Sequence, residues 1–400
     1  MAQFGDFTVD RNSAKYVLGS GGDIISYATD EPAFEFNADG SYKGLLVEPA
    51  ATNLAVQSED INTTWTTVAN GAVAASTTET PDGDTSSKNV KLVDDNTGGT
   101  GTVGIRQNIT LSASTKYTFS VFLKADGESF ARIELVSIDT ATNVLCFYQL
   151  SGSGATGGLS GNADGATIEK YPNDWYRCTI TFTTGTDPSG FNVRIQVATA
   201  IGVYGSTPLD STSSIFVWGA QVETGPIATS YIPTTTASVT RNKDDITLGS
   251  ASSLIGQTEG TLYVEVDWRL ATGTNQLLFS VNDGTGSNRL LIYNRNSPVQ
   301  LNMAAIANNA TLTDQGESST AYSGIQKIAF AYKTDDFKLY RNGSSIATDT
   351  SGSLAALATL TDIDIGQAFN ATLQVNMWIR AAALYPTRLS DAEAQALTTL

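Results

Sequence analysis

The groups that could perform acid–base chemistry in this sequence are carboxylates, because the chain contains no histidine. That absence excludes Ser-His-Asp, Cys-His and histidine–metal sites. The clearest carboxylate pair is Glu265 and Asp267, which lie two residues apart in an alternating run and so share one face of a predicted strand. A retaining glycoside hydrolase needs two carboxyl groups about 5–5.5 Å apart. The alternative, which we adopt, is that both are solvated residues of an amphipathic strand, and we expect no enzyme.

Aromatic side chains are the second group with a chemical use, because sugar-binding sites commonly include rings on which a sugar can stack. Tyr171 precedes a proline and Tyr204 lies in a loop between Gly202 and Gly205, so these two are expected on loops. For every candidate the alternative is packing inside a core. The candidate carbohydrate-binding residues are Tyr171, Trp175, Tyr204, Tyr293, Tyr322 and Trp378.

Two short acidic runs, 82–84 and 94–96, place carboxylates in predicted turns. Hard oxygen ligands suit calcium, so a structural Ca²⁺ is the candidate cofactor. Neither run matches a twelve-residue calcium-binding loop, and the alternative is polar turn residues without a metal. The candidate metal ligands are Asp82, Asp84, Asp94 and Asp95.

The charge balance limits the partners. The chain has 40 acidic and 23 basic residues, which gives a formal net charge of −17. Such a field repels phosphate backbones, so we expect no nucleic-acid partner and no docking on anionic membrane surfaces. An anionic glycan would need neutral contacts or bridging cations.

The N-terminal residues and the length of the apolar stretches indicate where the protein is made. The first residues, MAQFGDFTVDRN, contain neither a basic lead nor an apolar run, so we predict no signal peptide and synthesis in a cytoplasm. No stretch approaches the ~20 apolar residues of a membrane span, so we expect no membrane insertion.

Cys146 and Cys178 both lie in strand patterns. We predict two buried free thiols, with a disulfide as the alternative if their strands are neighbours.

The elements that must position these residues are strands. The chain contains 36 glycines and 10 prolines, and only 16% of its residues are charged, which is typical of an all-β protein with many turns. Residues 176–182 and 193–197 alternate apolar and polar positions, with Arg194 and Gln196 directed outward. Asn-Asp-Gly at 282–284 and Arg-Asn-Gly at 341–343 predict hairpins. Ser390 and Glu393 form a capping box that predicts one short C-terminal helix.

The stretch from Phe216 to Asp245 separates two sets of strands. It begins as a strand and continues through Gly225, Pro226 and Pro233. Proline donates no backbone hydrogen bond, so the second part cannot be an interior strand. We therefore predict two β-sandwich domains of jelly-roll type in tandem. The predicted division is an N-terminal attachment segment at 1–53, a first sandwich at 54–235 and a second sandwich at 236–400.

Several motifs carry a family resemblance. The segments WGAQVETGPIATSYIPT (218–234) and GLLVEPAATNLAVQSEDINTTW (44–65) resemble those that bracket carbohydrate-binding-module-like jelly rolls in phage and prophage tail and fibre proteins. The run DFKLYRNGSSIAT (336–348) and the C-terminal run resemble concanavalin A-like (laminin G-like) sandwiches. Retaining β-glucanases on that fold carry a pattern like E-x-D-x-x-E. Here Leu270 stands at the third acidic position, so the set is incomplete.

The resemblance implies a bacteriophage structural protein, as a tail fibre, baseplate or capsid fibre, that displays glycan-binding domains to a host surface. It implies a virion location, a homo-oligomer that we expect to be a trimer, and contacts with other virion proteins through residues 1–53. Jelly-roll carbohydrate modules often hold a structural calcium, so the resemblance also implies Ca²⁺. The alternatives are a capsid or tail decoration protein that binds no sugar and, third, a polysaccharide depolymerase.

Overall fold

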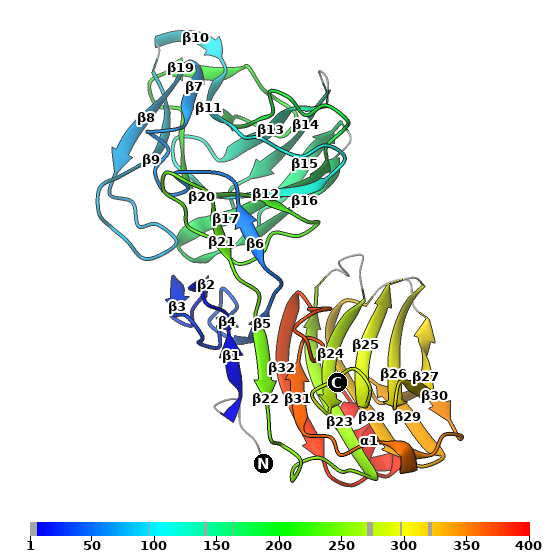
Figure 1. Cartoon of the computed structure of the whole chain (residues 1–400). Coiled ribbons are helices and arrows are strands. Elements are labelled where there is room, and N and C mark those ends of the chain that lie inside the picture. Colours follow the sequence, from blue (N-terminus) through cyan, green and yellow to red (C-terminus); the bar gives the residue numbers. More distant parts are fainter. Residues whose placement is uncertain are drawn as a thin grey trace.

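The computed structural model describes residues 6–95, 97–139, 142–161, 163–269, 275–296, 298–318 and 322–400. It consists of two antiparallel β-sandwiches with a small hairpin between them (Figure 1). The all-β prediction is confirmed. None of the described helices is long and apolar enough to cross a membrane.

The first sandwich contains two six-stranded sheets. One sheet has the order β15 (Ala155–Ser160), β14 (Thr142–Gln149), β13 (Phe130–Asp139), β18 (Asn192–Ala198), β11 (Val103–Asn108) and β7 (Thr66–Ala69). The facing sheet has the order β16 (Ala163–Lys170), β17 (Trp175–Thr183), β12 (Lys116–Ala125), β20 (Ser214–Thr224), β9 (Lys88–Asp94) and β8 (Gly71–Ser76). A separate pair is formed by β10 (Thr97–Gly101) and β19 (Thr207–Asp210). A one-turn 3₁₀ helix, Pro172–Asp174, precedes β17.

The core of the first sandwich follows the predicted alternation. The apolar positions of β17 and β18 face inward, and Arg194 lies on the outer side of its sheet, as predicted. Cys146 on β14 and Cys178 on β17 are both buried free thiols, which confirms the predicted state. Burial raises the pKa of each thiol, so both remain protonated at neutral pH and act as small apolar side chains.

The second sandwich contains two seven-stranded sheets. One has the order β1 (Thr8–Asp10), β22 (Asp245–Leu248), β31 (Asp362–Ile365), β24 (Gln276–Asn282), β25 (Arg289–Asn296), β26 (Val299–Ala307) and β27 (Ala310–Ser318). The other has the order β30 (Ser344–Asp349), β29 (Asp336–Arg341), β28 (Gly324–Lys333), β23 (Glu259–Trp268), β32 (Met377–Tyr385), β5 (Tyr42–Val47) and β4 (Phe34–Phe36). A 3₁₀ turn spans Leu354–Ala356.

The C-terminal helix forms where its capping signal predicts it. α1 (Asp391–Thr398) begins after Ser390, whose side chain accepts a hydrogen bond from the Glu393 amide, while the Glu393 carboxylate accepts one from the Ser390 amide. The helix covers the outer side of β28 and β29 through Ala394. The two predicted hairpins join β24 to β25 and β29 to β30.

The N-terminal strands belong to the second sandwich of their own chain. β1 pairs with β22, with Val9 opposite Ile246, and β5 pairs with β32, with Leu46 opposite Trp378. The sequence left open whether residues 1–53 dock on their own chain or on a neighbour, and the structure shows own-chain pairing. β2 (Lys15–Leu18) and β3 (Ile24–Tyr27) form the small hairpin between the sandwiches (Figure 1).

The chain therefore starts in the second sandwich, leaves it to build the first, and returns. β6 (Ala51–Asn53) carries it out and β21 (Val239–Arg241) carries it back, and these two strands pair antiparallel (Figure 1). The proline-containing connector between β20 and β21, residues 225–238, packs against the first sandwich. The Tyr231 ring lies 4.6 Å from the Trp218 ring, and the Ile232 amide donates to the side-chain oxygen of Gln221.

A cluster of buried charges joins the N-terminal segment to the return strand. The Lys15 Nζ lies 2.7 Å from Asp244 Oδ2 and 3.1 Å from Glu48 Oε2, and all three side chains are at most 2% exposed. Arg11 adds a 3.0 Å contact to Asp244, and Arg241 a 3.5 Å contact to Glu48. We call Arg11, Lys15, Glu48, Arg241 and Asp244 the junction cluster.

The Glu48 carboxylate of the junction cluster is held in its ionised form. Burial alone would raise the pKa of Glu48, but Lys15, Arg241 and Arg269 outweigh burial and place that pKa well below the ordinary value. Removing one partner from such a cluster leaves an uncompensated charge in a low-dielectric place, which is far more costly than losing a surface pair.

The variant Lys15→Met tests this account of the junction. It removes one cation and leaves Asp244 and Glu48 short of a partner, so we expect a loss of about 3–5 kcal/mol in the free energy of unfolding. The control is Lys333→Met, which breaks the exposed 3.5 Å pair with Glu259 and should change stability by less than about 1 kcal/mol. Denaturant unfolding measures both, and equal losses would contradict the account.

Candidate functional site

Four of the six candidate aromatic residues are buried. Trp175 is 0% exposed and its indole N–H donates to the Glu79 carbonyl, 2.9 Å away. The Tyr322 hydroxyl donates to the Glu317 carbonyl and accepts from the Leu301 amide. Tyr171 belongs to the same buried group as Trp175. For these residues the packing alternative describes the structure.

Trp378 is the fourth buried candidate, and its ring is occupied by cations. The Lys43 Nζ lies 4.0 Å and the Arg269 guanidinium 4.6 Å from the ring centroid. The indole N–H donates to Glu35 Oε2 at 2.7 Å. Trp378 therefore ties β32 to β4, and it offers no open face to a sugar.

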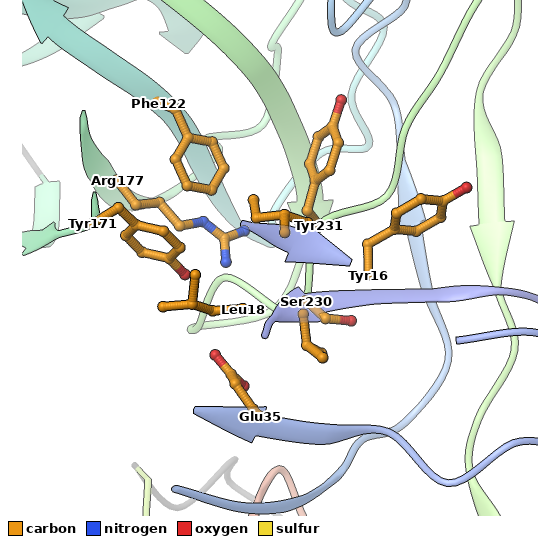
Figure 2. Close-up of a pocket in the computed structure, with 10 residues that line it drawn as sticks. Tyr16, Leu18, Glu35, Phe122, Tyr171, Arg177, Ser230 and Tyr231 are labelled. Atoms are coloured by element: carbon orange, nitrogen blue, oxygen red, sulfur yellow. The ribbon is translucent and has the colours of Figure 1, made fainter. Parts of the chain in front are cut away.

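A small cavity lies where the N-terminal hairpin meets the first sandwich. Figure 2 shows side chains converging on it from β2, β4, β12, β17 and the connector. Its volume is about 10 Å³, which is the space of one water molecule and too little for a sugar ring. Burial raises the pKa of Glu35 on its wall, against the opposing effects of Lys43 and the Trp378 hydrogen bond. The cavity belongs to the joint between the sandwiches.

Tyr293 is half-buried on the outer side of the second sandwich. Its hydroxyl donates to Asp314 at 2.7 Å and accepts from Arg295 at 2.9 Å. Burial and the Asp314 carboxylate raise its pKa to about 12. The Tyr293 hydroxyl is satisfied by its own neighbours, so it is not free to bind a ligand.

Tyr204 is the candidate that the structure leaves open. It is 60% exposed in the loop between β18 and β19. The Arg132 guanidinium lies over the ring, 4.0 Å from its centroid. Such a cation–π contact holds a ring in place while its other surfaces remain accessible. Tyr204 is therefore the best-placed stacking platform among the six.

Strand register brings polar residues together beside Tyr204. On the outer side of the first sandwich, Arg132 of β13 lies opposite Gln196 of β18. One step along the strands, Glu134 lies opposite Arg194, and Arg194 lies opposite Arg106 of β11. We call this surface the arginine face, and it comprises Arg106, Arg132, Glu134, Arg194, Gln196 and Tyr204.

The arginine face is organised around Arg132. One amino group donates to Gln196 Oε1 at 2.7 Å and the other lies 2.9 Å from Glu134 Oε1. Burial lowers the pKa of the Arg132 guanidinium, Arg194 lowers it further, and Glu134 and Tyr204 act in the opposite direction. The Arg132 Nε has no hydrogen-bond partner although it is buried.

The sequence predicted only part of the arginine face. It predicted Tyr204 on a loop, and it predicted Arg194 and Gln196 as outward residues of a strand. It missed Arg106, Arg132 and Glu134. The alternation of Arg132 and Glu134 with Ala131 and Ile133 was a usable signal, because it places both charges on one face.

The acidic runs do not assemble a calcium site in the described residues. Asp84 lies 2.9 Å and Asp82 3.6 Å from the Lys88 ammonium, which stands where a cation would bind. Asp94 is buried and accepts a hydrogen bond from the Ser211 amide, while Asp95 is exposed. No described group of three acidic or sulfur ligands could hold a metal ion. Calcium stays a prediction, and these contacts do not support it.

One member of the carboxylate pair on β23, Glu265, is tied to a basic residue. Glu265 Oε1 accepts from Arg380 Nε at 2.9 Å, and its other oxygen accepts from the Tyr263 hydroxyl at 3.3 Å. Asp267 is partly exposed on the same strand. Leu270, at the third acidic position of the pattern, lies outside the described residues. The ion pair with Arg380 links Glu265 of β23 to β32, which is a structural role.

Comparison with known proteins gives similarity of fold alone. No known protein family and no curated protein matches the sequence. The CBM40 domain of the Ruminococcus gnavus IT-sialidase is 18% identical over 38% of this chain and 88% of that chain, with a TM-score of 0.33. The botulinum neurotoxin serotype D/C binding domain is 16% identical over 39% and 40%, with a TM-score of 0.32. Chicken galectin 2 is 12% identical over 31% and 88%, with a TM-score of 0.23. These values are too low to carry an argument about function.

A carboxylate with a strongly raised pKa lies away from the arginine face, on β31 of the second sandwich. Burial raises the pKa of Asp364 on β31 to about 7, the charges of Asp245 and Asp362 act in the same direction, and a hydrogen bond from Asn282 lowers it. An unfolded aspartate has a pKa of about 3.9. Between about pH 4 and pH 7 the folded chain therefore holds a proton that the unfolded chain releases, so stability falls as pH rises through this window.

The variant Asp364→Asn should remove this pH dependence. The amide keeps an acceptor for Asn282 and carries no charge at any pH, so we expect the variant to exceed the parent by about 1–3 kcal/mol at pH 8 and to equal it near pH 4. Denaturant unfolding from pH 4 to pH 8 measures this difference. The exposed Asp95→Asn serves as the control, and identical pH slopes in the parent and Asp364→Asn would refute the assignment.

Proposed function

We propose that this chain is a bacteriophage structural protein that binds host-surface glycans through the arginine face. The observation that carries the glycan part is the exposed ring of Tyr204 held on the Arg132 guanidinium. A ring that is fixed before the ligand arrives loses little freedom on binding, which favours affinity. Arg194, which is partly exposed beside it, supplies donors for hydroxyl groups, while the buried Gln196 and Glu134 hold Arg132 in place.

The virion part of the proposal is supported by the sequence resemblance, and one structural finding strengthens it. The two segments that carry the resemblance, 44–65 and 218–234, lie far apart in the chain but interlock. The Asn53 side-chain amide donates to the carbonyls of Ala220 and Ile232, and the Ser58 and Tyr231 hydroxyls are 2.7 Å apart. Residues 53–58 of the first motif therefore pack against the second motif at the base of the first sandwich, while residues 44–47 of the first motif belong to β5 of the second sandwich.

The proposed assembly is a homotrimer within a virion, because single sugar sites are weak and linked copies raise avidity. The strands of residues 8–53 pair within their own chain, so contact with another virion protein would use the surface they leave open. Ile25 on β3, 41% exposed, marks such a surface on the hairpin.

A decoration protein without sugar binding is the second candidate, and one observation favours it. Ile201 and Val203, next to Tyr204, are 39% and 38% exposed. Exposed apolar side chains beside one another are typical of protein contacts as well as of ligand sites. In that case the loop of Tyr204 would be covered by a neighbouring chain in the particle.

The first test is binding to surface polysaccharide extracted from the host, measured with the purified chain. Tyr204→Ala removes the stacking platform, which should cost about 1 kcal/mol or more, or at least about fivefold in Kd. Tyr42→Ala, which removes another partly exposed tyrosine on β5, should leave Kd unchanged. A folded Tyr204→Ala variant with unaltered binding would move the site elsewhere.

The decoration alternative gives the opposite result in the same assay. A folded parent that binds no polysaccharide, while the loop of Tyr204 is protected from proteolysis in intact particles, would support it. Repeating the assay with a chelator tests the calcium prediction, since loss of binding would implicate the acidic runs.

The second test concerns location and oligomeric state. We expect light scattering to give three times the 42.1 kDa chain mass. Antibodies against the chain should label purified phage particles in electron micrographs. A monomer in solution together with unlabelled particles would overturn the virion proposal and leave glycan binding to be judged by the first test.

A further inference from the structure

Two arginines lie directly opposite one another on the outer side of the first sandwich. In the register of β11 and β18, Arg106 is the partner of Arg194. Like charges at directly opposite positions of a sheet are destabilising. The pair therefore needs either a counterion within the protein or a ligand that supplies one.

The protein supplies only part of that counterion. Glu134 lies 2.9 Å from Arg132 and 3.7 Å from Arg194, so its one negative charge is divided between two guanidinium groups. Arg106 is exposed and its side chain donates to the Thr66 hydroxyl at 3.4 Å. Within the part of the chain that the structure describes, no salt bridge involves Arg106. The arginine face thus holds three positive charges against one negative.

This excess is notable because the whole chain carries a net charge of −17. Among these arginines Arg106 is exposed and Arg194 is partly exposed, so an anion from solution can reach them and find a low electrostatic energy there. Guanidinium groups are also suited to the task, because their planar donors bind a carboxylate or a sulfate through two parallel hydrogen bonds.

We propose that the carbohydrate bound at the arginine face carries an anionic group, a carboxylate or a sulfate, which lies between Arg106 and Arg194 while a sugar ring stacks on Tyr204. This inference rests on the proposed glycan binding and names its ligand class. The anion position lies between β11 and β18, and the Arg132 guanidinium that carries Tyr204 comes from β13, two residues along the register. The two positions are therefore about one and a half strand spacings apart across the sheet and two residues apart along it, or about 10 Å in all. A disaccharide spans that length.

The same charges limit which anions are accepted. The overall negative field repels extended polyanions, which disfavours nucleic acid. Glu134 repels a second anionic group placed close to the first. A saccharide with isolated acidic groups between neutral hydroxyl-bearing rings fits both constraints.

The test compares matched saccharides. An array presents acidic oligosaccharides beside counterparts in which the carboxylate is reduced or the sulfate removed, together with an acidic peptide and a DNA oligonucleotide. The full-length parent should bind one acidic saccharide at least tenfold more tightly than its neutral counterpart, and this preference should weaken at high salt. Arg106→Gln and Arg194→Gln should each abolish the preference while binding of the neutral counterpart persists.

Two controls separate this inference from others. Lys333→Gln removes an exposed cation elsewhere and should keep the preference. Arg106→Gln should leave the melting temperature unchanged or raise it, because it relieves the repulsion of Arg194, whereas a structural arginine would lower it.

Three results would overturn the inference. Equal binding of acidic and neutral saccharides, abolished by Tyr204→Ala, would refute the anion site and leave glycan binding in place. An acidic preference that survives both arginine substitutions would place the anion elsewhere. Tighter binding to the peptide or to DNA, or no saccharide binding by the folded chain, would refute this inference and the proposed function together.

Discussion

The structure depends on a few charges that are sealed from water. Lys15 lies between Glu48 and Asp244, and Arg11 and Arg241 make further contacts to the same two carboxylates. Each of these residues comes from the segment before the first sandwich or from the segment after it. Ions of this kind are tolerated inside a protein only when their partners are all present. The N-terminal strands can therefore take up their position only when residues more than two hundred positions later in the chain have folded against them.

The rest of the architecture follows from that condition. β5 is fixed beside β32, and the chain continues from it into β6, which leads to the first sandwich. β21 brings the chain back and pairs with β6. The connector then lies against the first sandwich, where Glu48 accepts a hydrogen bond from the Ser230 amide. The same carboxylate thus contacts the N-terminal hairpin and the connector, which places the first sandwich relative to the second.

How much of this the sequence could predict depended on which interactions are local. Alternation in residues 176–182 and the capping box at Ser390 concern neighbouring residues, so strands, hairpins and the helix were predictable. β1 and β21 have three residues each, which is too short for a periodic signal, and only their distant partners define them. Trp175 was an attractive sugar platform by its neighbours in sequence, yet tertiary packing buries it. The Arg106–Arg194 pair required strand register, which no single segment contains.

The order in which the chain visits its two sandwiches has an evolutionary consequence. The first sandwich is entered and left through paired strands, so its two ends lie side by side, a condition under which insertion of a folded unit is tolerated. All five residues of the junction cluster lie outside 54–235 and would stay behind if that unit were replaced. A recombination event could therefore exchange the arginine face for another binding surface, provided that the incoming unit brought its own contacts for Asn53 and Glu48. Under the proposed function, such an exchange would change the bound glycan in one genetic step while the second sandwich stayed the same.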